Sequence, residues 1–411
     1  MHPTLGVLGL GKEKVMAITP TTELAGKIRE LCGENTYLCY QCQKCSVGCP
    51  TAHAMTYRPA QIMRAVQFGL QDMLLQDASI WRCLTCETCG TFCPNDLHPR
   101  DVIEVLRCMA MENGHSFDQD PVLERGVRAL RMLGTRIDDA HNISGDANDN
   151  RLIWATNLRE QPPNLDRKKG AETVYFVGCV SSLYPMSYAV PQAFVTILEK
   201  SGEDYTTMGP EEWCCGYPLL IGGQVKAAEA VMRHNVEVVR SLGAKRVVMT
   251  CPSCYHSWHH VYPEVVGDLG FEVMHATELM ANMVEANRLP MKEGRKMVVT
   301  YHDPCDLGRK GGIFDAPRTV LQAIPGVTFV EMDSRRETAL CCGGGGNLET
   351  FDADLGAEVA TKRLAEAQAV QAQVIASACP QCERTLTKST RANKVRIRVM
   401  DVAQLVEGAL E

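Results

Sequence analysis

Hydrophobic residues recur at two different spacings in the two parts of the chain. Between about residues 31 and 133, apolar side chains return every three or four positions, as in YRPAQIMRAVQFGL and PRDVIEVLRCMAMENG, and prolines stand near the helix starts. From about residue 171, short apolar runs such as TVYFVGC, KRVVMTCPSC, MVVTYHDPC and AQVIASACPQC alternate with helical stretches. The pattern predicts a multidomain protein: a small α-helical domain at 31–133, then α/β domains with mostly parallel sheets.

Two segments lack this periodicity. Residues 134–170 are polar and rich in Asp and Asn, so we expect a linker without a motif, ordered against a neighbour through Ile153 and Trp154. Residues 1–30 begin with a short apolar stretch that has neither a basic leading region nor a small-residue cleavage site. We therefore expect an N-terminal tail or a partner-docking arm and not a signal peptide.

The α/β part is an internal duplication. Three cysteines of its first half recur in its second half at offsets of 126 to 128: Cys179, Cys214 and Cys251 as Cys305, Cys341 and Cys379. The segment VMHATELMANMVE, which begins at Val273, also aligns with VMDVAQLVEGALE, which begins at Val399. We predict two similar domains, 171–290 and 291–411, packed face to face around a pseudo-symmetric site. The cysteines end predicted strands, the edge at which open sheets bind ligands.

The amino-acid composition limits the classes of function that this chain can have. Of 411 residues, 45% are hydrophobic and 22% charged, as in ordinary globular proteins, and the net charge of −7 gives no support for nucleic-acid binding. No run of about 18 apolar residues is present, so we expect no membrane span. Twenty cysteines without an export signal favour thiolate metal ligands in a reducing compartment over disulfides, and we expect a cytoplasmic protein.

The helical part contains two ferredoxin motifs, CYQCQKCSVGCP and CLTCETCGTFCP, each with the spacing C-x₂-C-x₂-C-x₃-C-P. In this spacing three thiolates wrap one cubane [4Fe–4S] cluster and the fourth cysteine reaches the other cluster. We assign Cys39, Cys42, Cys45 and Cys93 to the first cubane, and Cys83, Cys86, Cys89 and Cys49 to the second. Zinc-binding knots and redox-inactive structural clusters are the alternatives, but two cubanes in one small domain favour an electron wire. Cys32 and Cys108 are left over, and we expect them to be buried free cysteines.

Each half of the duplication carries five cysteines that include an adjacent pair. The first half has Cys179, Cys214, Cys215, Cys251 and Cys254, and the second has Cys305, Cys341, Cys342, Cys379 and Cys382. A pair that serves one site needs a tight backbone, which Gly216 and the run 343–346 permit. Structural zinc is the alternative, although a fifth thiolate has no role in a four-coordinate zinc site.

This paired-cysteine pattern, present twice, resembles the cysteine-rich "CCG" domains in the B subunit of heterodisulfide reductase. The helical part resembles the C subunit of that enzyme, so the chain is similar to a fusion of the two, as in the D type of heterodisulfide reductase. The resemblance implies that each five-cysteine set holds a noncubane [4Fe–4S] cluster, and that two cubanes feed these two clusters. It also implies a disulfide substrate that is cleaved or formed between them with one electron from each. The implied partner is a flavoprotein similar to the A-type component of that enzyme, or another electron-transfer subunit.

Several polar residues adjoin the motifs. His256, His259 and His260 follow one cysteine pair, and His302 and Asp303 precede Cys305. His256 and His302 are candidate proton donors to a leaving thiolate, and a hydrogen-bonded polar surface is the alternative. Arg309 and Lys310 either attract an anionic substrate or form a solvated charged face, and Asn347 is a candidate helix cap.

Three functions remain open. The first is a disulfide oxidoreductase at the paired clusters. The second is a non-catalytic relay in a larger flavin-containing complex, such as an electron-bifurcating or an acyl-CoA or aromatic-ring reductase. The third is the iron–sulfur subunit of a quinone-linked hydroxyacid or glycerol-3-phosphate dehydrogenase. No G-x-G-x-x-G follows a predicted strand, so we expect no NAD or flavin on this chain.

Overall fold

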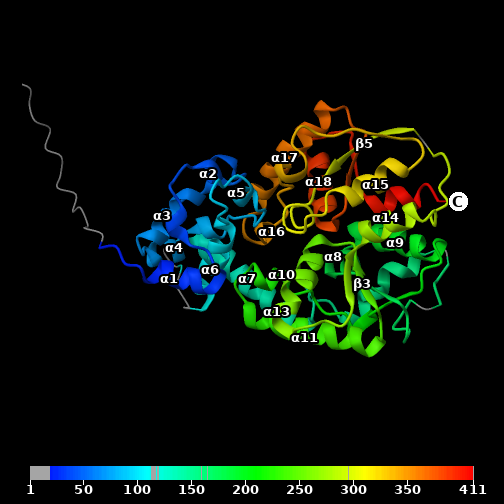
Figure 1. Ribbon diagram of the computed structural model, residues 1–411, viewed down its shortest axis with the longest axis horizontal. Helices are drawn as coiled ribbons and strands as arrows, with labels where there is room; N and C mark the ends of the chain where they lie inside the picture. Colours follow the sequence, from blue (N-terminus) through cyan, green and yellow to red (C-terminus); the bar gives the residue numbers. More distant parts are fainter. Residues whose placement is uncertain are drawn as a thin grey trace, which may run out of the picture.

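The protein has an elongated shape, with a helical domain at one end and two stacked α/β halves at the other (Figure 1). The computed structural model describes residues 19–112, 117, 120–158, 160–163, 165–294 and 296–410. The stretch 1–18 of the expected tail therefore lies outside the described residues. Among those described, no helix is both long and apolar enough to cross a membrane.

The N-terminal domain is built from short helices joined by cysteine-bearing loops. The helices are α1 (Glu23–Cys32), α2 (Lys44–Gly48), α3 (Pro59–Gln67), α4 (Gln71–Leu75), α5 (Thr88–Thr91) and α6 (Pro99–Glu112). Both α3 and α6 begin with proline, whose missing N–H costs nothing at the first helical position. Most of helix α1 lies within the expected tail, yet Leu24 and Ile28 are buried in the core of this domain.

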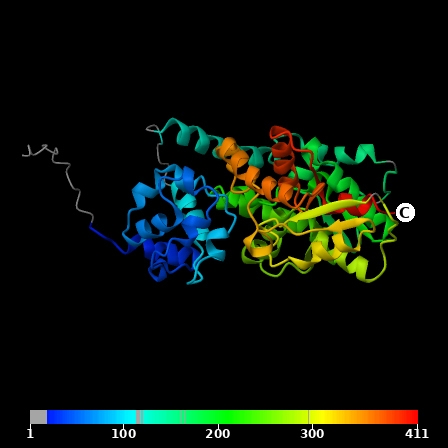
Figure 2. The same cartoon turned by 90° about the horizontal axis from the view of Figure 1, so that it is seen from above.

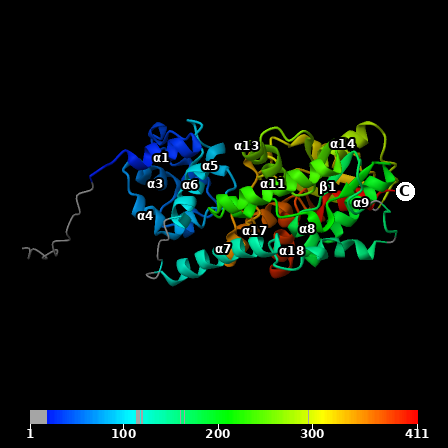
Figure 3. The ribbon, with the colours of Figure 1, turned by 90° about the horizontal axis from the view of Figure 1, so that it is seen from below.

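A long helix, α7 (Pro121–Ala140), leads from this domain along the α/β halves (Figures 2 and 3). Asp120 caps it by accepting hydrogen bonds from the N–H groups of Val122 and Leu123. The helix continues six residues beyond Gly134, where we expected the linker to begin. A 3₁₀ segment, η4 (Asn148–Asn157), follows, with Trp154 fully buried and Ile153 largely exposed.

Each α/β half contains a four-stranded parallel sheet, and the two sheets have the same strand order. The first sheet runs β2 (Tyr205–Thr207), β1 (Thr173–Phe176), β3 (Arg246–Met249), β4 (Glu272–His275). The second runs β6 (Val327–Phe329), β5 (Met297–His302), β7 (Val374–Ser377), β8 (Arg398–Asp401). This matching order confirms the predicted duplication of α/β domains.

Helices cover both sheets. The first half has α8 (Cys179–Leu183), α9 (Ala189–Lys200), α10 (Tyr217–Leu220), α11 (Val225–Leu242), α12 (Pro252–His256), α13 (Tyr262–Val266) and α14 (Ala276–Glu285). The second has α15 (Asp315–Ala323), α16 (Leu348–Phe351), α17 (Ala353–Ala369), α18 (Pro380–Ala392) and α19 (Val402–Glu407). Helix α9 packs on α19 and α14 on α15, so the halves share one apolar core and hold a fixed relation.

Candidate cysteine-lined site

The two N-terminal cysteine loops have the same unusual backbone. Gln41 and Gln43 in the first loop and Thr85 and Glu87 in the second have φ angles of 64°, 63°, 50° and 63°. These residues occupy equivalent positions between the cysteines. Left-handed conformations are costly for residues other than glycine, so their repetition at matching places indicates a shape that serves a bound group.

The thiols of these loops fall into two groups. Burial, and then the charges of Cys39, Cys42 and Cys93, raise the pKa of Cys45 to about 11. The pKa of Cys89 is likewise raised well above its ordinary value, by burial and by the charges of neighbours that include Cys83, Cys86 and Cys49. In each group the charges that raise the pKa come from cysteines of one motif and from the fourth cysteine of the other.

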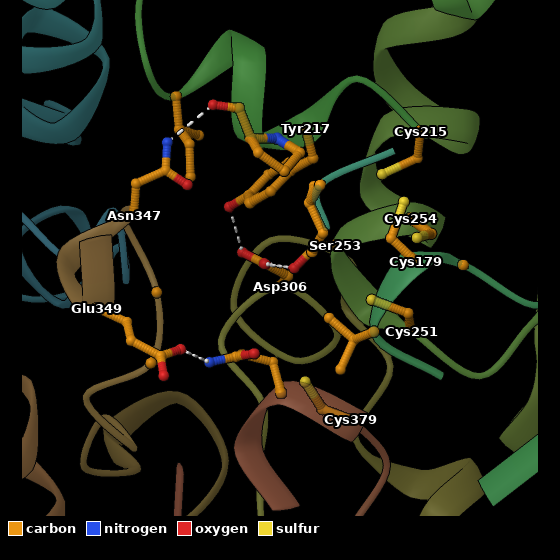
Figure 4. Close-up of a pocket in the computed structure, with 18 of the residues that line it drawn as sticks. Cys179, Cys215, Tyr217, Cys251, Ser253, Cys254, Asp306, Asn347, Glu349 and Cys379 are labelled. Atoms are coloured by element: carbon orange, nitrogen blue, oxygen red, sulfur yellow. Dashed lines mark hydrogen bonds between the residues drawn. The ribbon is translucent and has the colours of Figure 1, made fainter. Parts of the chain in front are cut away.

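The α/β cysteines gather around one cavity between the two halves (Figure 4). Cys179, Cys251 and Cys379 follow β1, β3 and β7, so the strands deliver them to one edge of each sheet, as predicted. The cavity has a volume of about 540 Å³. The cysteines that line it are Cys179, Cys214, Cys215, Cys251, Cys254, Cys305, Cys342, Cys379 and Cys382. Both halves thus contribute thiols to a single space.

All twenty cysteines lie in the described residues, and none forms a disulfide. In the first half, Cys214 and Cys254 lower the pKa of the Cys215 thiol by hydrogen bonding, whereas the pKa of Cys254 is raised by the same contact. Buried thiols in contact with one another, without disulfides, are a donor set suited to soft, thiolate-bound metals such as iron–sulfur clusters.

Glycines allow the second half to close around its paired cysteines. The N–H groups of Gly343 and Gly344 donate to the sulfurs of Cys341 and Cys342, each at 3.4 Å. A Cβ at Gly343 would lie 2.1 Å from the carbonyl oxygen of Gly356, so only glycine fits there. Such N–H groups stabilise added negative charge on a cluster sulfur.

The second half also contacts the N-terminal domain. Cys341, the one α/β cysteine that does not line the cavity, contacts Cys86 of the second ferredoxin loop and packs in the N-terminal core. Arg309 holds this junction, because its Nε donates to the carbonyl oxygen of Cys86 at 2.6 Å and its Nη1 to that of Ala339 at 2.7 Å. The second ferredoxin loop is therefore next to the second five-cysteine set.

A buried polar network crosses the cavity from one half to the other. Tyr217 of the first half donates to Asp306 of the second at 3.0 Å, and Ser253 donates to the same carboxylate at 2.6 Å. Lys310 pairs with Asp306 at 2.8 Å, and the Lys310 side chain is only 2% exposed. Lys310 is thus not part of a solvated charged face, and its charge is already paired with a carboxylate of the protein.

The candidate histidines occupy different environments. His302 is buried beside Cys342 and Cys382, with one donor atom of each within 4.8 Å of the others. Burial, and then the charge of Arg363, lower the pKa of His302 to about 3. Burial and Lys310 lower the pKa of His256 to about 3 as well, so both imidazoles are neutral at pH 7. His259 and His260 are exposed.

The remaining sequence candidates serve the scaffold. Asp303 binds Arg318 through two hydrogen bonds of 2.7 and 3.0 Å. Asn347 occupies the N-cap position of α16, but its side chain makes no capping bond and instead donates to the carbonyl oxygen of Pro218 at 2.8 Å. Cys32 and Cys108, expected to be buried, are only partly buried.

Arg151 is a site residue that the sequence analysis missed. It comes from η4, in the segment we expected to be a linker without a motif, and it is 2% exposed. Its Nη2 donates to the sulfur of Cys179 at 3.3 Å and its Nη1 to the carboxylate of Glu212 at 2.5 Å. A lone arginine in a polar stretch gives no sequence signal that separates it from a surface residue.

Two protein families match this chain. Residues 173–258 and 299–387 each match the family described as "Cysteine-rich domain". Residues 38–98 match the family described as "4Fe-4S dicluster domain". The first match occurs once in each half of the duplication, and the second covers both N-terminal loops.

Among curated proteins, the D subunit of the dihydromethanophenazine:CoB--CoM heterodisulfide reductase of Methanosarcina mazei is 33% identical over 398 residues, 90% of this chain and 93% of that protein. The "Probable iron-sulfur-binding oxidoreductase FadF" of Bacillus subtilis is 30% identical over 86% of this chain, but over only 48% of its own length. The "EtfAB:quinone oxidoreductase" of Syntrophomonas wolfei is 28% identical over 83% of this chain and 48% of its own.

A solved structure supports the fold. The crystal structure of a hypothetical protein from Helicobacter pylori superposes with a TM-score of 0.55 at 10% identity, covering 95% of this chain and 72% of that one.

Proposed function

Because the chain belongs to the family of iron–sulfur proteins that form the D-type component of heterodisulfide reductase, we propose that it is an oxidoreductase subunit that cleaves or forms a disulfide. The observation that carries this proposal is the single cavity lined by nine thiols from both halves. In the proposal, electrons pass from two cubane clusters in the N-terminal domain to two noncubane clusters at the cavity. Neither half encloses the cavity alone, so the duplication is part of the site.

The proposed ligands are those expected from the sequence. The cubanes would be held by Cys39, Cys42, Cys45 and Cys93, and by Cys83, Cys86, Cys89 and Cys49. The noncubane clusters would be held by Cys179, Cys214, Cys215, Cys251 and Cys254, and by Cys305, Cys341, Cys342, Cys379 and Cys382. When bound, such clusters supply one-electron redox chemistry at two neighbouring places, as the two-electron cleavage of a disulfide requires.

The protein's own residues shape that cavity. The network of Tyr217, Asp306, Ser253 and Lys310 fixes the two halves relative to each other across it. At the second cysteine set, Arg363 donates to Nδ1 of His302 at 3.1 Å, which leaves the proton of the neutral ring on Nε2. Nε2 is buried without a hydrogen-bond partner among the described residues, and the ring lies beside Cys342 and Cys382.

The exposed surface of the first ferredoxin loop is the proposed docking place for an electron-transfer partner. Cys42 is exposed there, so the first proposed cubane reaches the surface. Around it stand exposed apolar side chains, including Tyr40 at 61% and Val47 at 87% exposure. Apolar and aromatic groups around a redox centre are typical of an interface core. A flavoprotein similar to the A-type component of heterodisulfide reductase is the partner that the family favours.

The test is anaerobic purification, iron analysis and viologen-linked reduction of a panel of disulfides. We expect about 16 iron atoms per chain, four per cluster, and turnover of at least one disulfide. A content of about 8 iron atoms per chain would mean that the cavity holds no clusters, and it would contradict the proposal.

A relay is the second candidate function. The relatives FadF and EtfAB:quinone oxidoreductase align with over four-fifths of this chain, and their names mention no disulfide. A protein with about 16 irons that reduces no disulfide, yet passes electrons to a quinone-linked or flavin-containing acceptor, supports the relay.

A further inference from the structure

Arg151 breaks the symmetry of the duplication at the cavity. It lies in η4, between α7 and β1, outside the segments that match the two families. The guanidinium is enclosed by protein, and it reaches the sulfur of Cys179, the first cysteine of the first set. Burial makes the interaction strong, because no bulk water screens the charge.

The surroundings hold this guanidinium in one orientation. Its Nε donates to Asn148 at 2.9 Å, and its Nη1 donates to Ser182 at 3.3 Å as well as to Glu212. The Glu212 carboxylate is itself fixed by two backbone N–H groups: that of Val177 donates to Oε2 at 2.8 Å, and that of Gly178 donates at 2.9 Å to Oε1, which also accepts from Arg151. The pair thus forms a dipole whose positive end lies on Cys179.

The corresponding cysteine of the second set has a different environment. The sulfur of Cys305 is hydrogen bonded to the carboxylate of Asp306, at 3.9 Å, and that carboxylate is paired with Lys310. The charges of Lys310 and Arg309 also act on this thiol, but neither group donates a hydrogen bond to its sulfur among the described residues. Arg309 of the same loop donates its hydrogen bonds to the backbone carbonyls of Cys86, Glu337 and Ala339. Among the described residues, a guanidinium-to-sulfur hydrogen bond therefore occurs in the first half and has no counterpart in the second.

The two five-cysteine sets also differ in their contact with the ferredoxin loops. Cys341 of the second set contacts Cys86 of the second ferredoxin loop, whereas all five cysteines of the first set line the cavity. We propose that Arg151 is a positioning residue that raises the reduction potential of the group held by the first five-cysteine set, so that electrons entering at the second set move on to the first. Positive charge and an N–H···S bond both favour the reduced, more negative state of a cluster. This inference rests on the proposed function.

The test is a reductive titration of the anaerobic holoprotein, followed by electron paramagnetic resonance. The signal of the first set is identified as the one lost in Cys179→Ser, and that of the second set as the one lost in Cys305→Ser. In Arg151→Met we expect the reduced-to-oxidised ratio of the first signal, at fixed ambient potential, to fall by about tenfold. The second signal is expected to stay in place.

Glu212→Gln is the matched control, because it removes the negative partner and keeps Arg151. It is expected to shift the first signal in the opposite direction, toward easier reduction. A general structural disturbance would move both variants the same way. If Arg151→Met fails to assemble, Arg151→Lys, which keeps the charge and loses the two-sided bridge, is expected to shift in the same direction by less.

Shifts of the same sign in Arg151→Met and Glu212→Gln, unchanged signals, or equal shifts of both signals overturn the inference while leaving the proposed function intact. A wild-type protein with about 8 irons and no signal lost in Cys179→Ser overturns the proposed function and this inference together.

Discussion

Arg107 is the residue at which three parts of the protein meet. It is 1% exposed, and its five hydrogen bonds with described residues all go to backbone carbonyl oxygens. These acceptors belong to the N-terminal domain (Ile80, Trp81 and Cys83), the first half (Ile221) and the second half (Gly346). The fork of a guanidinium suits this task, which a lysine ammonium cannot perform.

We predict that Arg107→Met lowers the free energy of unfolding by about 2–5 kcal/mol, because the carbonyls lose their donor and stay buried. Arg128→Met, on the exposed face of α7, is the control and is expected to change stability by less than about 0.5 kcal/mol. Urea unfolding of both anaerobic proteins is the measurement. Equal midpoints for the two variants would show that Arg107 does not join the domains.

His98 gives the N-terminal domain a pH dependence. Its hydrogen bond to Glu87, at 2.8 Å, raises the pKa of His98 to about 9. Burial raises the pKa of Glu87, but the bond from His98 and the charge of Arg100 outweigh burial and lower it to about 2. The carboxylate thus stays charged at all physiological pH values, and the histidine is the group that titrates.

In the unfolded chain, His98 loses its proton near its ordinary pKa of 6.5. In the folded protein, it keeps the proton up to a pH of about 9. Its contribution to stability is therefore complete below pH 6.5 and is lost as the pH rises to 9. We predict that the difference in stability between wild type and His98→Gln shrinks across this window. Urea midpoints from about pH 6 to about pH 9.5 measure it. A difference that is constant over the window contradicts the assignment.

Helix α7 is the element that the sequence described least well. Its start was readable from Asp120 and Pro121, and its apolar spacing continues through Leu133 to Ile137. The polar run after Gly134 suggested a linker because the helix is exposed on its outer side. The buried side of α7 contacts residues that are far away in the sequence: Gly134 lies against Gln224, and Gly126 lies against Phe351. Contacts between residues far apart in sequence leave no periodic signal.

Other elements were predictable because local rules determine them. The strands that end in cysteines and the duplicated sheet order follow from apolar runs and the repeat. The convergence of thiols on one cavity follows from the carboxyl-end rule for parallel strands. Two contacts could not be predicted from local rules: that of Cys341 with Cys86 and the hydrogen bond from Arg151 to Cys179. Both depend on how separately folded units dock.

The close approach of α7 to α16 gives a prediction for these two elements. A Cβ at Gly126 would lie 2.4 Å from the ring of Phe351, whereas at Gly26 in α1 nothing lies within 4 Å. We predict that Gly126→Ala destabilises the protein by about 1–3 kcal/mol through overpacking. Gly26→Ala is expected to stabilise it by about 0.5–1 kcal/mol, because alanine favours a helix. Thermal unfolding compares the two, and a stabilised Gly126→Ala would contradict the packing of α7.

For the whole molecule, the buried thiols link stability to iron. Sets of contacting thiols, several with raised pKa values, are poorly suited to stay buried as thiolates without a metal. We predict that anaerobic removal of iron by a chelator lowers the urea midpoint, and that added iron and sulfide restore it. A midpoint that is the same with and without iron would mean that the cysteine sites are structural without metal.

If both five-cysteine sets act together on one disulfide, damage to either set must stop the reaction. In Cys215→Ser and in Cys342→Ser, viologen-linked disulfide reduction is measured beside the wild type, and iron analysis checks that each variant keeps at least the roughly eight irons proposed for the N-terminal domain. We predict that the wild type turns over a disulfide and that each variant loses turnover, although one set remains intact. Turnover that survives in either variant would contradict a shared site, and no turnover by a fully loaded wild type would favour the relay.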